Sequence, residues 1–324
     1  MTSMGSIERV GVIGLGTMGH GIAQVFALGG LTVRAYDDVA AARDSALDRI
    51  QTNLKAAERA KLVTRSETEN ALARITITES DSDAVADAQF VTEAVREDLA
   101  VKQELFPRLE VAVDDDTILV SNTSTFPMTQ IATGMRRPER ALNTHWFNPP
   151  HIVPLVEVVP GEKTTTAAVD VTVELLERCG KLAVRLRQEL PGFLINRIQT
   201  AMMREVVDLM ERGVASPEDI DRAMRGSVGL RLAALGPLRV WDYAGLDICG
   251  RVFSELVQDI RSSRELHESV RARMNAGDYG VKTGRGFFDH PAESRGAAQA
   301  TRDERYLALV KLFHTRGPAP GEPS

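Results

Sequence analysis

The glycine-rich turn near the N-terminus constrains the fold more than any other stretch of the sequence. Its six residues, GLGTMG from Gly14 to Gly19, follow the short apolar run RVGVIG and open the helical pattern GHGIAQVFALGG. A strand, a turn and a helix in this order are the context in which a G-x-G-x-x-G sequence binds a dinucleotide. Gly14 allows the tight turn, Gly16 lets the backbone approach a pyrophosphate, and Gly19 allows close packing of helix on strand. The turn, which also contains Thr17 and Met18, is therefore predicted to hold a dinucleotide pyrophosphate at a helix N-terminus.

An aspartate at the end of the next predicted strand indicates which dinucleotide binds. The run LTVRAYD ends at Asp37, and Asp38 follows it. A carboxylate at this place accepts hydrogen bonds from ribose hydroxyls and repels a 2′-phosphate. We therefore expect the cofactor to be NAD rather than NADP. Arg34 and Arg43 are the nearby cations that oppose this preference.

The pattern of short and long segments predicts the fold class. Up to about Arg187, β-branched runs alternate with helical patterns, which predicts an α/β Rossmann-type domain with a mostly parallel sheet. After Arg187 only helical patterns follow, and Gln188–Gly192 marks the boundary. We expect an NAD-binding domain over residues 1–188 and an all-helical domain for substrate binding and dimerisation over residues 189–324. Pro107, inside a predicted helix, indicates a kink or an early break there. The expected strands are RVGVIG, LTVRAYD, RITIT, QFVTEAV, DTILVSN, ALNTHWF, LVEVV and KLAVRLR.

Composition excludes several classes of partner. The formal net charge of −6 and the pI near 5.6 argue against a nucleic acid or an anionic membrane surface. Cys179 and Cys249 have no metal-ligand spacing and cannot form a disulfide framework, so no metal is expected and the thiols are taken as reduced. No apolar run is long enough to span a bilayer, and MTSMGSIERV lacks a signal-peptide core. The sequence therefore predicts a cytoplasmic protein that binds a small molecule.

A second informative stretch is HWFNPPHIVPLVEVV, which runs from His145 to Val159. Glu157 lies in the apolar run LVEVV, and burying a carboxylate there is costly unless it is paired or hydrogen-bonded. The nearest partner across the Asn-Pro-Pro turn is His145. An imidazole titrates near neutral pH and a carboxylate can fix its tautomer, so the pair would form half of a catalytic base. The alternative is a core histidine and a strand-edge glutamate with purely structural roles.

Seven motifs in order make this chain resemble the L-3-hydroxyacyl-CoA dehydrogenase family, and the resemblance runs from Val10 to Phe288. The family includes 3-hydroxybutyryl-CoA dehydrogenases, and enzymes acting on carnitine and gulonate are related members. The resemblance implies NAD-dependent oxidation of the 3-hydroxyl of (S)-3-hydroxyacyl-CoA to 3-oxoacyl-CoA in fatty acid metabolism. It also implies a homodimer formed through the helical domain. The motifs are GLGTMGHGIAQV, EAVREDLAVK, SNTST, HWFNPP, LVEVV, PGFLINRI and GVKTGRGFF.

The resemblance also implies roles for individual residues. His145 would be the general base, Glu157 would hold its other ring nitrogen, and Ser124 and Asn196 would be polar contacts to substrate. Asn148 would support the loop that follows His145 and contribute to substrate binding. Ser124 has an alternative reading as a helix cap, and an Asn-Pro turn alone is enough to explain Asn148.

Glu97 and Lys102, in VREDLAVK, match family positions near the nicotinamide end of the cofactor. For Glu97, a solvated helix N-terminus is an equally good explanation. Trp146 and the segment RLAALGPLRVWDYAGLD depart from the family pattern. Because both would line the substrate cleft, the identity of the acyl group is the feature that can be inferred least safely from the resemblance.

Two other functions remain open from the sequence. The first keeps the chemistry but replaces the thioester by a free 3-hydroxy acid such as L-carnitine or L-gulonate. The second is an NAD-binding protein without turnover, which the loss of Ser124, His145, Glu157 or Asn196 would favour. All four residues are present.

Overall fold

The computed structural model describes residues 7–316. Its contacts divide the chain into two compact units. One is built on Met1–Asn196 together with Asp303–Lys311, and the other on Arg197–Arg302.

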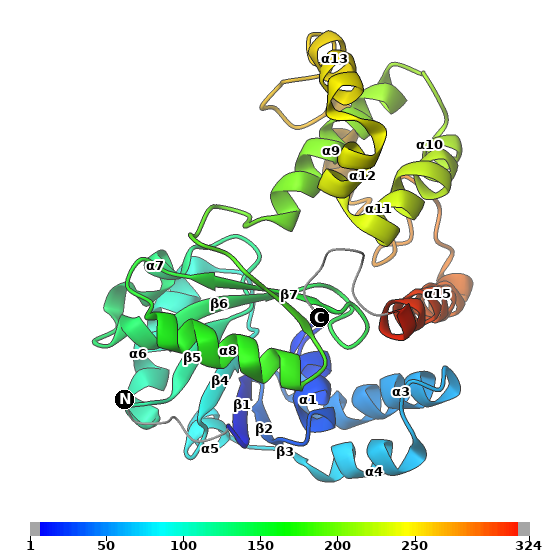
Figure 1. Cartoon of the computed structure of the whole chain (residues 1–324). Helices are drawn as coiled ribbons and strands as arrows, with labels where there is room; N and C mark the ends of the chain where they lie inside the picture. Colours follow the sequence, from blue (N-terminus) through cyan, green and yellow to red (C-terminus); the bar gives the residue numbers. More distant parts are fainter. Residues whose placement is uncertain (1–6, 317–324) are drawn as a thin grey trace. The chain divides into compact units, whose positions relative to one another are not determined.

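The first unit is organised around one eight-stranded sheet with the strand order β3-β2-β1-β4-β5-β6-β7-β8 (Figure 1). All eight strands expected from the sequence form. Neighbouring strands run parallel, with the β6–β7 pair as the one antiparallel step in this sheet. The prediction of a mostly parallel sheet is therefore confirmed. The strands are β1 Arg9–Ile13, β2 Thr32–Tyr36, β3 Ile75–Ile77, β4 Phe90–Glu93, β5 Ile118–Ser121, β6 Ala141–Trp146, β7 Leu155–Pro160 and β8 Leu182–Arg185.

Helices cover both faces of this sheet, because the strands are apolar on both sides. Successive residues of one strand point to opposite faces, and β5 shows the consequence. Ile118 and Val120 pack in one buried cluster with α1, α3 and α8, whereas Leu119 packs in another with α5, α6 and α7. The helices of this unit are α1 Gly19–Leu28, α2 Ala40–Asp44, α3 Ala46–Arg59, α4 Arg65–Ala73, α5 Asp81–Val85, α6 Leu99–Ala112, α7 Met128–Ile131 and α8 Thr166–Arg178, with 3₁₀ turns at Ala132–Gly134 and Pro138–Arg140.

Helix α6 differs from the sequence-based expectation. Asp98 caps its start, because the carboxylate accepts from the backbone N–H groups of Ala100 and Val101 at 3.0 and 3.2 Å. Pro107 lies inside the helix, yet the helix continues to Ala112. Of the kink or early break predicted at Pro107, the break is therefore wrong, and Leu105, Phe106 and Leu109 on either side of the proline are packed in the core.

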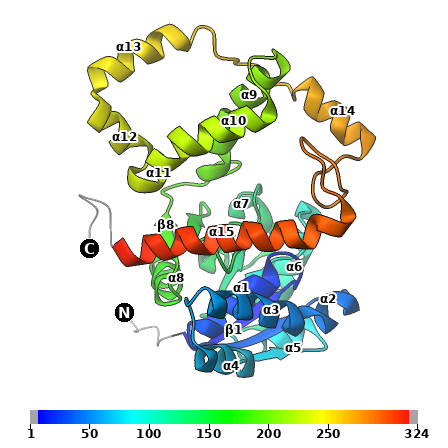
Figure 2. The same ribbon diagram turned by 90° about the vertical axis from the view of Figure 1, so that its right-hand side faces the viewer.

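The second unit is helical, as the sequence predicted, and its helices follow one another in an arc in Figure 2. Helix α10 starts as its sequence indicates, with Ser216 accepting from the N–H of Asp219 and Pro217 in the first turn. Of the residues that the structure describes in Arg197–Arg302, Val207, Asp208 and His267 are the buried ones. The elements of this part of the chain are α9 Ile195–Glu211, α10 Pro217–Met224, a π-helix at Arg225–Gly229, α11 Leu230–Leu235, α12 Pro237–Ala244, α13 Leu246–Leu256, α14 Glu268–Ala276, a 3₁₀ turn at Ala292–Ser294 and α15 Arg295–Arg316, of which Asp303–Lys311 belongs to the first unit.

Candidate active site

The glycine-rich turn connects β1 to α1 at the point where the strand order reverses, between β1 and β4. Ligands of open α/β sheets bind at this point, beyond the carboxyl ends of the strands. Gly14 has φ of +96°, and a Cβ there would lie 2.5 Å from the carbonyl oxygen of Ala94. At Gly19 a Cβ would lie 1.7 Å from the carbonyl oxygen of Gly14. Both positions therefore require glycine.

Gly16 is glycine for a different reason. A Cβ built at Gly16 meets no atom within 4 Å, so protein packing does not exclude a side chain there. Gly16 and Thr17 are exposed, while Met18 is partly buried against the core. The first turn of α1 contains no acidic residue, and the first N–H groups of a helix have no acceptor within the helix. An anion that approaches the backbone closely fits this turn, as a pyrophosphate does.

Asp37 lies directly after β2 and braces the same turn. One carboxylate oxygen accepts from the N–H of Leu15 at 2.6 Å, and the other accepts from the N–H of Val39 at 2.8 Å. Each oxygen keeps acceptor capacity, as contact with ribose hydroxyls requires. Of the two opposing cations, Arg34 pairs with Asp87 at 2.8 Å, whereas Arg43 donates to the carbonyl oxygen of Asp37 itself.

Arg49 of α3 donates hydrogen bonds to the carbonyl oxygens of the glycine-rich turn. The sequence analysis did not predict this role. The Arg49 guanidinium donates to the carbonyl oxygens of Leu15 at 2.7 Å and Gly16 at 3.2 Å. His20 also contacts the Gly16 carbonyl, at 2.7 Å, and burial lowers the pKa of this histidine. These contacts bring residues from α1 and α3 to one backbone segment, and no local pattern in the sequence signals them.

His145 and Glu157 lie directly opposite each other in the antiparallel β6–β7 pair. Residues that face each other in this way project from the same side of the sheet. Nδ1 of His145 is 2.7 Å from Oε2 of Glu157, and both side chains are buried. The expected pairing is present because the strand register places the two residues together.

The second oxygen of Glu157 is also satisfied. Oε1 accepts from the N–H groups of Leu194 and Ile195, at 3.2 and 2.8 Å, where α9 begins. With Oε1 held by these two donors, Oε2 is placed to accept a hydrogen bond from Nδ1 of His145. Nε2 is the nitrogen left for a substrate. The rings of Phe147 and Phe193 flank the imidazole, with centroids 4.5 and 5.5 Å away.

Ser124 lies in the loop after β5, and two hydrogen bonds fix its backbone. Its N–H donates to Oε1 of Glu97 at 2.9 Å, and the same oxygen accepts from the hydroxyl of Thr123 at 2.6 Å. The carbonyl oxygen of Ser124 accepts from Nδ2 of Asn196 at 3.2 Å. The structure therefore brings Ser124, Glu97 and Asn196 together, and the side chain of Ser124 is exposed.

Lys102 lies below the site instead of lining it. Its side chain is 1% exposed, and its ammonium is 2.7 Å from Oε1 of Glu93 and 3.4 Å from Oε2 of Glu97. Lys102 contacts Glu97, whose side chain is 40% exposed, and its predicted role near the nicotinamide end of the cofactor stays a prediction. Sequence reasoning missed Glu93. The acid within the apolar strand QFVTEAV was the available signal.

The loop after His145 is held from beneath by a buried lysine. Asn148 is exposed and precedes a cis peptide bond to Pro149. The ammonium of Lys181 donates to the carbonyl oxygens of Pro150 at 2.6 Å and Val153 at 2.8 Å. Burial lowers the pKa of Lys181 to about 7. Sequence reasoning did not identify this residue.

Within residues 7–316, the structure contains no cluster of three or more side chains suited to hold a metal ion. In the same range, no helix is long and apolar enough to cross a membrane.

A doubly wound sheet, a glycine-rich turn hydrogen-bonded to Asp37, and a buried His–Glu pair are the features expected of an NAD-dependent dehydrogenase, and the comparisons with known proteins show that class. The chain belongs to the 3-hydroxyacyl-CoA dehydrogenase family. Residues 9–189 match the NAD-binding domain of 3-hydroxyacyl-CoA dehydrogenase, and residues 192–290 match its C-terminal domain. The family resemblance and the NAD cofactor predicted from the sequence are thereby confirmed.

Relatives within this family carry different names. The chain is 36% identical to 5-formyl-3-hydroxy-2-methylpyridine 4-carboxylate 5-dehydrogenase of Mesorhizobium japonicum, over 96% of this chain and 99% of the relative. It is 36% identical to 3-hydroxybutyryl-CoA dehydrogenase of Mycobacterium tuberculosis, over 88% and 99%. It is also 36% identical to L-carnitine dehydrogenase of Streptomyces coelicolor, over 76% of each chain. A crystal structure of the pyridine carboxylate enzyme superposes with a TM-score of 0.90 at 35% identity, covering 96% and 99%.

Proposed function

We propose that this protein oxidises a hydroxyl group of a small hydroxy acid or its thioester, with the His145–Glu157 pair as general base. The contact that carries the proposal is the 2.7 Å distance between Nδ1 of His145 and Oε2 of Glu157. A buried carboxylate on one ring nitrogen fixes the tautomer and leaves the other nitrogen unprotonated, as a base must be.

Each residue then has a defined task in the oxidation. Nε2 of His145 takes the hydroxyl proton as the C–H electron pair leaves the same carbon as hydride. NAD, when bound, accepts that hydride. Glu157, held by the N–H groups of Leu194 and Ile195, keeps Nδ1 of His145 in place and stabilises the imidazolium that forms. In the reverse direction the imidazolium returns the proton to the developing alkoxide.

Ser124 and Asn196 are proposed as the contacts that orient the substrate oxygen. The backbone of Ser124 is fixed from two sides, by Glu97 and by Asn196. Its hydroxyl is therefore presented from a defined position, which lowers the entropy cost of orienting the substrate. Asn148, exposed in the loop after His145, is proposed as a further substrate contact.

The cofactor contacts are proposed to be the turn from Gly14 to Gly19 for the pyrophosphate and Asp37 for the adenosine ribose. The open space at Gly16 and the two braced oxygens of Asp37 support this assignment. The nicotinamide half then extends in the other direction, over the ends of β4 and β5, where Glu97 is exposed.

Two substrate classes are supported by different observations. The family match supports a (S)-3-hydroxyacyl-CoA thioester. The relative whose name specifies a pyridine carboxylate matches 96% of this chain, against 88% for the 3-hydroxybutyryl-CoA dehydrogenase. We therefore favour a free carboxylate substrate, with the thioester as the second candidate.

We also propose that the protein acts as a homodimer in the cytoplasm. Helices α12 and α13 expose large apolar side chains, among them Leu238, Tyr243, Leu246 and Phe253. Exposed apolar area of this kind is typical of a protein–protein interface. A second copy of the helical unit fits it, because each helical unit has the same face to cover.

The test follows absorbance at 340 nm with two kinds of substrate. Oxidation of NADH with acetoacetyl-CoA is compared with reduction of NAD by free 3-hydroxybutyrate, L-carnitine, L-gulonate and a hydroxymethylpyridine carboxylate. Turnover of a free acid alone supports the favoured class, and turnover of the thioester alone reverses the choice. Binding of NADH without turnover of any of these would contradict the favoured class and support a protein without catalysis.

A further inference from the structure

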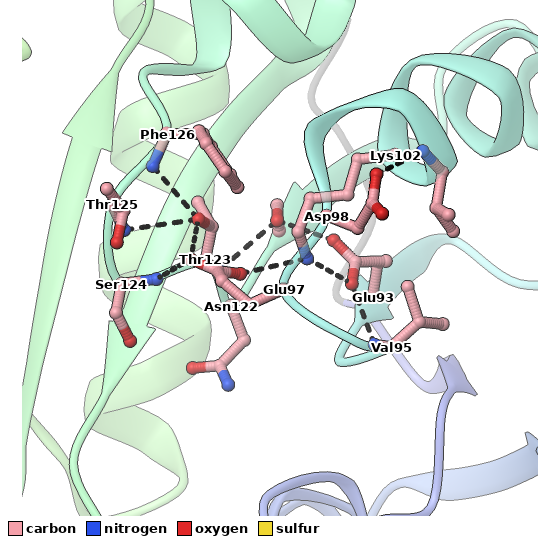
Figure 3. A network of polar contacts seen from close by, with 12 residues as sticks. Glu93, Val95, Glu97, Asp98, Lys102, Asn122, Thr123, Ser124, Thr125 and Phe126 are labelled. Carbon is pink, nitrogen blue, oxygen red and sulfur yellow. Dashed lines mark hydrogen bonds and ion pairs between the residues drawn. The ribbon is translucent and has the colours of Figure 1, made fainter. Parts of the chain in front are cut away.

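Glu93 is a buried carboxylate that the proposed reaction does not use. It is the last residue of β4 and is fully buried. Oε1 accepts from the ammonium of Lys102 and from the N–H of Val95, each at 2.7 Å, and Oε2 accepts from the hydroxyl of Ser121 at 2.5 Å. One carboxylate thus joins β4, α6 and the end of β5, as Figure 3 shows for its contacts with Lys102 and Val95.

Lys102 connects the buried Glu93 to Glu97, which is partly exposed at the site. Its single ammonium is shared between Glu93 and Glu97, at 2.7 and 3.4 Å. Glu93 is sealed from solvent, whereas the Glu97 side chain is 40% exposed. The buried ion pair therefore determines where an exposed carboxylate lies.

Glu97 in turn is hydrogen-bonded to the loop after β5. Its Oε1 accepts from the hydroxyl of Thr123 and the N–H of Ser124, and Thr123 Oγ1 in turn accepts from the N–H groups of Thr125 and Phe126 (Figure 3). The network of polar contacts that begins at Glu93 therefore ends at the backbone of Ser124, the proposed substrate contact.

Stability alone does not account for this arrangement. A buried ion pair is often no more stabilising than well-packed apolar side chains of similar volume, because both charges lose their hydration. The strand around Glu93 offers such packing, since Phe90 and Val91 are buried apolar residues. The position of the pair, at the carboxyl ends of β4 and β5, coincides with the edge at which a dinucleotide binds.

We infer that Glu93 is a positioning residue for the nicotinamide half of the cofactor and for Ser124. It acts through Lys102, which fixes Glu97. The inference rests on the proposed function, since it assigns Glu93 to that same site. Loss of the Glu93 charge frees Lys102 to move, and both Glu97 and the Ser124 loop lose their fixed positions.

The test compares two glutamates that receive the same substitution. Glu93→Gln removes the charge from the network. Glu110→Gln is the matched control, because Glu110 is a buried carboxylate of α6 that accepts from the N–H groups of Arg136 and Arg137, each at 2.8 Å. Both variants are expected to lower the thermal midpoint. Only Glu93→Gln is expected to weaken NADH binding, by about tenfold as for loss of one charged hydrogen bond, in a fluorescence titration.

The double variant Glu93→Gln with Lys102→Met separates positioning from folding. It removes both buried charges, so its thermal midpoint should rise above that of Glu93→Gln. Its NADH affinity and kcat should stay low, because Glu97 remains unfixed. Recovery of NADH affinity together with stability would overturn the inference, and so would equal NADH affinity in Glu93→Gln and Glu110→Gln. Failure of the unaltered protein to bind NADH would instead contradict the proposed function.

Discussion

Two buried glutamates at the same edge of the sheet are alike in most respects and differ in their partners. Glu157 and Glu93 are each fully buried and each 2.7 Å from a basic nitrogen. The partner of Glu157 is an imidazole, whose second nitrogen lies on the opposite side of the ring. The partner of Glu93 is the ammonium of Lys102, a single atom that two carboxylates surround.

The difference is the reason why we propose a catalytic role for the His145–Glu157 pair and a positioning role for the Glu93–Lys102 pair. Imidazole can hold a carboxylate at Nδ1 and exchange a proton at Nε2, and it titrates near neutral pH. An ammonium has one nitrogen, and in Lys102 that nitrogen is buried between Glu93 and the partly exposed Glu97, so it presents no second atom to a substrate. We therefore expect substitutions at the first pair to act on turnover and substitutions at the second to act mainly on binding and stability.

The largest effect is expected from His145→Ala. Removal of the base should lower kcat on the order of 10²–10⁴-fold, the usual share of general acid–base catalysis. NADH binding should be retained, because the glycine turn and Asp37 are untouched. Steady-state rates and an NADH titration check both statements. Near-normal turnover would mean that the His145–Glu157 pair has no catalytic role that the Glu93–Lys102 pair lacks.

Glu157→Gln should have the next largest effect. Its oxygen would face the N–H groups of Leu194 and Ile195, leaving the NH₂ group toward Nδ1 of His145. The imidazole would then carry its proton on Nε2, where a base must be unprotonated, and kcat should fall by about 10²-fold or more. A loss of less than about twofold would show that the carboxylate serves only the fold.

Lys102→Met should affect turnover less and stability more. It leaves Glu93 buried without its counter-charge, and breaking a buried pair in this way costs about 3–5 kcal/mol. Urea unfolding measures the loss, and kcat should fall by only about tenfold, as for one charged contact. A fall in kcat as large as that of His145→Ala would mean that the Glu93–Lys102 pair contributes to turnover as much as the His145–Glu157 pair does.

Lys181→Met gives the smallest effect, and the effect depends on pH. Lys181 is a buried base that donates to two backbone carbonyl oxygens, and burial lowers its pKa from 10.5 to about 7. Between about pH 7 and 10.5 the unfolded chain binds more protons at this residue than the folded protein does, so its contribution to stability rises with pH. Relative to the unaltered protein, the Met variant should therefore be more stable at pH 6 than at pH 9 in urea unfolding. No change in this difference with pH would mean that Lys181 is charged in the folded state.

Much of the site was predictable because its signals are local. The turn from Gly14 to Gly19 and the strand ending at Asp37 follow from adjacent residues and the period of the apolar pattern. The pairing of Glu157 with His145 follows from the cost of an unpaired carboxylate and a short connection between two strands. Glu93 carried the same signal, an acid within an apolar strand. The sequence does not reveal its partner, because Lys102 lies on a helix and is not joined to the strand of Glu93 by a short turn between two strands.

The sequence by itself determined the eight strands, the glycine-rich turn between β1 and α1, the His–Glu pairing and the change to an all-helical second part. Each of these depends on residue type and on periods within a few positions of the chain. Only the tertiary structure decided that Lys102 is buried beneath the site, that Arg49 braces the turn, and that Asn196 holds the carbonyl of Ser124. These contacts join elements far apart in the chain. They exist only once the strand order and register have set which side chains meet.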